Sequence, residues 1–114
     1  APLVAVITIT LIVASIIGAG KQQVINAGLT LLFAVFTLHV GGFVLGYAAG
    51  RLILGQERAA RTVSIEVGMQ NSGLGVVLAR QNFASPLVAI PCAISAVIHS
   101  LIGSLAAAVW RRKP

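Results

Sequence analysis

Three long stretches of this chain contain no charged residue, and they limit its fold more than any other feature. They cover residues 1–20, 22–50 and 81–110. At about 1.5 Å per helical residue, each is long enough to cross a hydrocarbon layer roughly 30 Å thick. Only 9% of the 114 residues are charged, whereas a soluble domain carries about 25%. The sequence therefore predicts an all-α integral membrane protein that contacts a lipid bilayer.

A single transmembrane region is expected over residues 1–114, with about four helices. Their expected positions are residues 2–19, 24–54, 58–80 and 86–110. We expect a helix even for the Val- and Ile-rich first segment, because backbone polar groups in lipid must form their hydrogen bonds within the segment itself. A polar turn is expected over residues 18–23. Ser85 followed by Pro86 is a typical helix start, and Pro91 can kink the last helix.

The basic residues are unevenly distributed in a four-span arrangement. Six lie on one side and two on the other: Arg51, Arg58, Arg61, Arg111, Arg112 and Lys113 against Lys21 and Arg80. Lys and Arg concentrate in cytoplasmic loops, so we expect a cytoplasmic C-terminus in a bacterial inner membrane or its equivalent. A three-span arrangement loses this asymmetry. The net charge of +6 is not gathered into a basic and aromatic face, which argues against nucleic acid as a partner.

Small residues mark one face of the second helix. Gly42, Gly46 and Gly50 recur every four residues, a pattern that lets a neighbouring backbone approach closely. We interpret His39, which lacks an obvious partner in the sequence, as structural. Cys92 is the only cysteine, so no internal disulfide can form, and we expect a small buried side chain.

The third segment is unusually polar for a membrane span. Its polar residues are Arg61, Thr62, Ser64, Glu66, Gln70, Asn71 and Ser72. Three glycines fall among or just after them at positions 68, 73 and 75, and each costs about 1 kcal/mol of helix propensity relative to Ala. We therefore expect two half-helices joined by an unwound stretch near residues 68–75.

Glu66 is the residue of this segment that most directly indicates a function. A carboxylate inside a span costs several kcal/mol unless it is protonated, paired or bound to a cation. Glu66 and Gln70 can supply side-chain oxygens to a sodium-like ion, and the unwound backbone from Val67 to Asn71 can supply carbonyls. The same carboxylate could instead carry a proton, so coupling to Na+ or to H+ stays open at this point.

Residues 66–73, Glu-Val-Gly-Met-Gln-Asn-Ser-Gly, preceded by Arg-Thr-Val-Ser-Ile, resemble the discontinuous helix of the bile acid:sodium symporter family. The resemblance extends from Pro86 to Ser104. It implies a ten-helix fold with two inverted repeats, of which this chain is similar to the last four helices. The N-terminal helices of the same transporter would then be its partners. The start at Ala1, without an initiator Met or a signal-peptide pattern, agrees with a part of a longer protein.

The resemblance also implies roles for individual residues. Glu66, Val67, Met69 and Gln70 match ligands of one sodium ion, with Val67 and Met69 acting through backbone carbonyls. Glu66 would be shared with a second ion.

A substrate site is implied by the same resemblance. Asn71 would lie at the helix crossing beside the substrate, followed by Ser72. His99 matches a polar position of the cavity, and Ser100 stands where bacterial bile-acid-binding relatives can carry Asn. The substrate would be a small organic anion, bile-acid-like or a small carboxylate.

The sequence thus predicts a sodium-coupled secondary symporter of organic anions. Two alternatives remain: a small structural or pore-forming membrane protein, and a proton-coupled carrier that uses Glu66. An enzyme is not expected, because two acids and two histidines form neither a catalytic triad nor a carboxylate pair.

Overall fold

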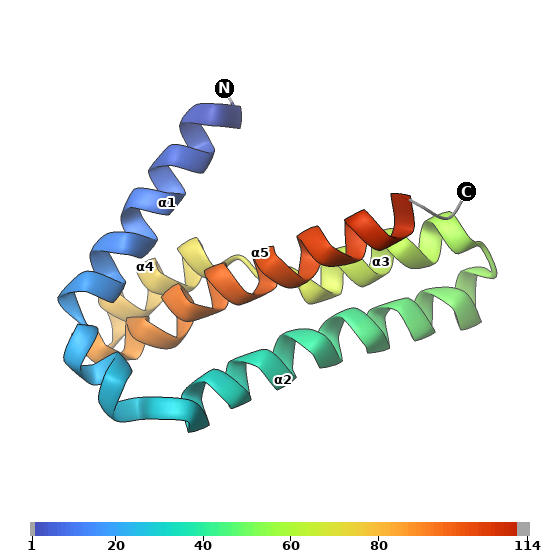
Figure 1. Cartoon of the computed structure of the whole chain (residues 1–114). Coiled ribbons are helices and arrows are strands. Elements are labelled where there is room, and N and C mark those ends of the chain that lie inside the picture. Colours follow the sequence, from blue (N-terminus) through green and yellow to red (C-terminus); the bar gives the residue numbers. More distant parts are fainter. Residues whose placement is uncertain (1, 112–114) are drawn as a thin grey trace.

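The described part of the chain consists of helices joined by short connections, and one of these helices is interrupted (Figure 1). The structure, a computed structural model, describes residues 2–111. The elements are α1 (Pro2–Ala19), α2 (Lys21–Leu54), α3 (Glu57–Gly68), α4 (Ser72–Asn82), the 3-10 helix η1 (Pro86–Ala89) and α5 (Ile90–Arg111). α3 and α4 are the two halves of the interrupted helix. The prediction of an all-helical chain is confirmed.

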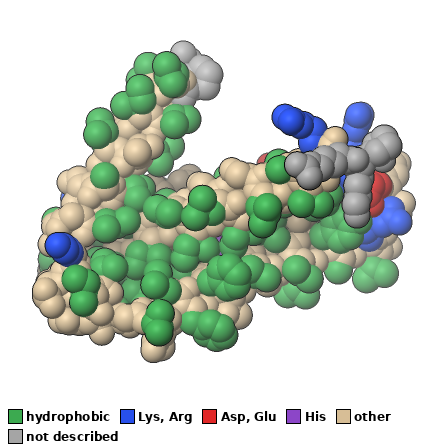
Figure 2. All heavy atoms as spheres, viewed as in Figure 1, with side chains coloured by type: hydrophobic (Ala, Val, Ile, Leu, Met, Phe, Trp, Pro, Cys, Tyr) green, Lys and Arg blue, Asp and Glu red, His purple; other side chains and the backbone are tan. Residues whose placement is uncertain are grey.

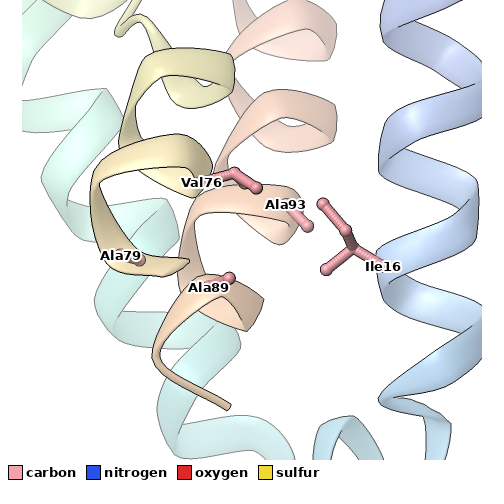
Figure 3. Close-up of a cluster of buried hydrophobic side chains, with 5 residues drawn as sticks. All are labelled: Ile16, Val76, Ala79, Ala89 and Ala93. Atoms are coloured by element: carbon pink, nitrogen blue, oxygen red, sulfur yellow. The ribbon is translucent and has the colours of Figure 1, made fainter. Parts of the chain in front are cut away.

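The long helix α2 packs along α3, while α5 lies against α2 and α4. α1 projects away from this group and meets it through its C-terminal half (Figure 1). Figure 3 shows Ile16 of α1 pointing toward Val76 of α4 and Ala93 of α5. Ala79 and Ala89 complete this buried cluster. Because most residues of this cluster are small, α4 and α5 can pack closely together. Their apolar side chains form the surface on which α1 packs.

The glycine face of α2 packs on α3, which confirms the predicted close approach of a neighbouring backbone. A Cβ atom built at Gly50 would lie 2.7 Å from the Cα of Ala60, which is fully buried. One at Gly46 would lie 3.0 Å from the carbonyl oxygen of Val63. One at Gly42 would lie 3.1 Å from the carbonyl oxygen of Val67, at the end of α3. The absence of side chains on this face therefore brings the α2 backbone directly against the interrupted helix.

A polar and aromatic cluster joins α2, α3 and α5 at one end of the molecule. Glu57 accepts hydrogen bonds from the Tyr47 hydroxyl and from Nε of Arg61, both at 2.8 Å. Arg61 also donates from Nη1 to the Trp110 carbonyl oxygen at 3.3 Å. The rings of Tyr47 and Trp110 stack with centroids 6.1 Å apart. Arg61, one of the polar residues of the predicted third span, thus forms hydrogen bonds at the end of α3 that lies away from the break.

Charged side chains gather at this end, where the α2–α3 turn meets the C-terminal end of α5 (Figure 2). The described members of the larger basic group are Arg51, Arg58, Arg61 and Arg111. The other two, Arg112 and Lys113, lie outside the described residues. Lys21 at the start of α2 and Arg80 near the end of α4 lie toward the opposite end.

The outer surface is covered with large apolar side chains (Figure 2). Leu29 is 82% exposed and Leu52 is 86% exposed, which requires lipid or further protein around them. Two described helical stretches, Lys21–Leu54 and Pro86–Arg111, are long and apolar enough to cross a membrane. α3 and α4 have only 12 and 11 residues, so neither can span a bilayer alone. The number of crossings therefore stays a prediction.

Two details near the chain's glycines and prolines differ from expectation. α2 begins at Lys21, and the polar turn predicted before it is reduced to the link at Gly20. The non-helical residue is Gly28, with φ 58° and ψ −154°, a conformation that only glycine adopts readily.

Ser85 caps η1 through the amide of Leu87, as expected. Pro91 lies in the first turn of α5, where its missing N–H breaks no helical bond, so no mid-helix kink is needed there.

We expect Gly28→Ala to lower the stability of the purified protein by about 1 to 3 kcal/mol, because Ala would be strained at this φ and ψ. Gly41→Ala is the matched control. Gly41 is helical, and nothing lies within 4 Å of a Cβ atom built there, so its replacement should be neutral or slightly stabilising. Thermal unfolding in detergent measures both, and equal shifts for the two variants would contradict the strain at Gly28.

Candidate functional site

The interruption between α3 and α4 is short and sharply bounded. α3 ends at Gly68 and α4 begins at Ser72, so residues 69–71 are not helical. The predicted break is confirmed, but the predicted window of residues 68–75 was too wide. The helix resumes early because the side-chain oxygen of Asn71 accepts a hydrogen bond from the Leu74 amide at 3.0 Å. This N-cap outweighs the low propensity of Gly73 and Gly75, which lie inside α4.

The break removes the helical partners of four successive carbonyl groups. The last bond of α3 runs from the Met69 amide to the Ile65 oxygen at 2.8 Å. In the described part of the chain, no i+4 amide reaches the carbonyl oxygens of residues 66–69. The Val67 oxygen instead accepts from Nε2 of Gln70 at 3.0 Å, and the Gly68 oxygen is 2.9 Å from Nδ1 of His39. Oxygen ligands freed from helix bonding are therefore present at this point.

The residues assigned to sodium, Glu66, Val67, Met69 and Gln70, cluster at this end of α3. All four are exposed. Within the described residues, the Glu66 carboxylate has neither an ion pair nor a hydrogen bond. Arg61, the nearest cation along the helix, is bonded to Glu57 instead. The negative charge of Glu66 is thus not neutralised by any cation of residues 2–111.

The residues assigned to the substrate do not form one group. Ser72 and His99 are buried together, with the Ser72 hydroxyl 3.2 Å from Nε2 of His99. Asn71 is exposed and caps α4. Ser100 is exposed as well, and its hydroxyl donates to the Ala96 oxygen at 2.7 Å. The helical turn of α5 therefore points Ser100 away from the buried pair, although it follows His99 directly.

Two hollows accompany these residues. One, of about 250 Å³, lies at the break and is lined by Gln70, Asn71 and Ser72 together with parts of α2 and α5. Cys92, expected to be buried, is only partly so and contributes to this lining. The other, of about 470 Å³, lies between α1 and α5 and is mainly apolar, with Ser100 on its wall. Two mainly apolar hollows, the smaller one with Gln70, Asn71 and Ser72 in its wall, thus flank the start of α4 and the middle of α5.

His39 is the residue whose importance the sequence analysis missed. Its side chain is 1% exposed. It contacts the Gly68 oxygen and, through Nε2, the Ser95 hydroxyl at 2.6 Å. The interpretation of His39 as structural agrees with these buried bonds, but the sequence did not show its partners, because they lie on α3 and α5, 29 and 56 residues away. A histidine inside an uncharged span was itself a signal, since such a residue must find partners there.

Comparison with known proteins gives relatives that cover almost the whole chain. It is 45% identical over 113 residues to the probable sodium/metabolite cotransporter BASS1, chloroplastic, of Oryza sativa subsp. japonica, an alignment that takes in 99% of this chain and 28% of that protein. The corresponding Arabidopsis thaliana protein is 45% identical over 111 residues, with 97% and 28% covered. The uncharacterized sodium-dependent transporter YocS of Bacillus subtilis (strain 168) is 43% identical over 113 residues, with 98% and 35% covered.

These relatives and the interrupted helix define the class: the chain is homologous to multi-pass membrane transporters, which are not enzymes. The chain belongs to the bile acid:sodium symporter family, as the residues of its third segment predicted. No family model matches the chain. It spans 28 to 35% of the length of these three relatives.

Proposed function

We propose that this chain is part of a sodium-coupled secondary symporter of small organic anions, and that the α3–α4 break holds part of the sodium site. One observation carries the proposal. Among the described residues, four successive carbonyls without helical partners begin at Glu66, whose carboxylate has no ion pair or hydrogen bond there. The chain is homologous to proteins named as a sodium/metabolite cotransporter and a sodium-dependent transporter. Those names also favour symport over a purely structural or pore-forming role. Sodium in this proposal is a transported ion rather than a cofactor.

The ligand roles follow from charge and geometry. Glu66 supplies the negative charge that a cation needs in a medium of low dielectric. Val67 and Met69 supply carbonyl oxygens, which retain a free lone pair even when one hydrogen bond is made. The side-chain amide nitrogen of Gln70 donates to the Val67 oxygen. The side-chain oxygen of Gln70 can therefore bind the ion. Broken helices place ions in this manner in secondary transporters.

The anion would lie near the start of α4. A helix N-terminus favours negative charge through its free amides and its dipole, and Asn71 and Ser72 stand at that terminus. His99 supports Ser72 from α5, while Ser100 faces the apolar hollow beside α1. A carboxylate with an apolar body, bile-acid-like or smaller, suits this combination. We propose that helices corresponding to the rest of the relatives' length supply the remaining ligands within the lipid bilayer.

The proposed topology has four crossings and a cytoplasmic C-terminus. Single cysteines at Arg58 and Arg112, in a version with Cys92 replaced, should both be labelled from the cytoplasmic side of closed membrane vesicles. The reason is the excess of basic residues on that side in a four-span arrangement, six against two. Labelling of the two positions from opposite sides would refute both the orientation and the number of crossings.

We expect Glu66→Gln, made in the full-length transporter, to abolish sodium-dependent uptake while membrane insertion and folding are retained. Gln keeps the size and one oxygen but removes the charge, and a neutral amide costs less to bury than a carboxylate. The measurement is uptake of labelled taurocholate and pantoate into proteoliposomes under an inward sodium gradient at fixed pH.

Glu57→Gln is the matched control, because Glu57 is the chain's only other acid and it lies in the Tyr47–Arg61 cluster. It should transport nearly as well as the wild type. A Glu66→Gln variant that still concentrates substrate along the sodium gradient would contradict the proposed site. If wild-type uptake depends on a proton gradient and not on sodium, the coupling ion is H+ rather than Na+.

A further inference from the structure

His39 joins three helices at the break through a chain of buried hydrogen bonds. It lies midway along α2, and its Nδ1 is 2.9 Å from the Gly68 oxygen at the end of α3. Its Nε2 is 2.6 Å from the Ser95 hydroxyl of α5. That hydroxyl is 3.2 Å from the hydroxyl of Ser72, which is in turn 3.2 Å from Nε2 of His99. None of these four side chains is more than 9% exposed.

When both imidazole rings are neutral, the donors and acceptors in this series of hydrogen bonds can be arranged in only one direction. A carbonyl oxygen only accepts, so Nδ1 of His39 must carry the proton and donate to Gly68. Nε2 of His39 then accepts from Ser95, and Ser95 accepts from Ser72. Ser72 has used its proton, so it accepts from Nε2 of His99. One arrangement satisfies every bond, which ties the Gly68 carbonyl to α5 through His39.

The backbone around the break also packs closely against α2. A Cβ atom at Gly42 would lie 3.2 Å from the Cα of Gly68. A Cβ atom at Gly68 would overlap the ring of Phe43. The Ser64 hydroxyl donates to the Phe43 oxygen at 2.6 Å. Residue 68 therefore has little freedom to shift, and the direction of its carbonyl is set by α2.

We propose that His39 is a positioning residue for the sodium site, and that Ser95, Ser72 and His99 hold its ring in the orientation required. Gly68 lies between Val67 and Met69, whose carbonyls the preceding section assigns to sodium, so the inference rests on that proposed function. Fixing the Gly68 carbonyl toward His39 fixes the two adjoining peptide planes. Each neighbouring carbonyl then keeps a lone pair for the ion, including that of Val67, which also accepts from Gln70. Without His39, the buried Gly68 oxygen would have to find another donor, and the peptides would turn.

The test uses the purified full-length transporter and sodium ion alone as the probe. Thermal unfolding is followed while NaCl replaces KCl at constant ionic strength, and the sodium concentration for half-maximal stabilisation is recorded. His39→Asn keeps a donor at the position of Nδ1, His39→Gln keeps a polar group at the position of Nε2, and His39→Phe keeps neither. A purely structural role would lower the midpoint in KCl without changing the half-saturating sodium concentration.

We expect His39→Phe and His39→Gln to raise the half-saturating sodium concentration about tenfold, and His39→Asn to stay within about threefold of the wild type. If His39→Phe does not fold, the comparison of the Asn and Gln variants decides. Wild-type sodium dependence in the Gln variant, or equal weakening in the Asn and Gln variants, overturns the inference.

Glu66→Gln in the same titration separates this inference from the proposed function. Loss of sodium stabilisation in Glu66→Gln, together with wild-type half-saturation in the His39 variants, overturns the positioning role alone. Unchanged sodium stabilisation in Glu66→Gln overturns the proposed sodium site and the positioning role with it.

Discussion

The need to provide a partner for each buried backbone carbonyl governs the centre of this structure. In lipid a helix meets that need internally, and an interruption leaves carbonyls that something else must bind. Here the break at residues 69–71 frees four of them. His39 and Gln70 bind two, and the glycine face of α2 allows His39 to come close enough to do so. The Met69 oxygen, together with the second lone pair of the Val67 oxygen and the Glu66 carboxylate, forms the basis of the proposed ion site.

The features that sequence could predict are those set by local chemistry. Helical spans follow from uncharged stretches, the glycine face of α2 follows from a spacing of four, and the break follows from polar residues and glycines within one apolar segment. Ser85 and Pro86 identify the start of the last helical region for the same reason. Each depends on residues within a few positions of one another, so no knowledge of the tertiary arrangement is required.

What could not be predicted depends on which helices meet. The partners of His39 come from α3 and α5, and only the folded arrangement brings them together. The family resemblance assigned Ser100 to the substrate site together with His99, but the turn of α5 separates the two side chains. The bend at Gly28 was missed because a glycine in an apolar helix is usually a packing residue, and its sequence neighbours give no sign of a positive φ.

The most direct test of the account is a structure of the full-length transporter determined in Na+ and again in K+. The account predicts an ion in the sodium structure, bound by the Glu66 carboxylate and by the carbonyl oxygens of Val67 and Met69, with His39 still bonded to the Gly68 oxygen. The ion should be absent when K+ replaces Na+. A continuous helix through residues 66–73, with the Asn71 amide bonded to the Val67 oxygen in both conditions, would contradict it.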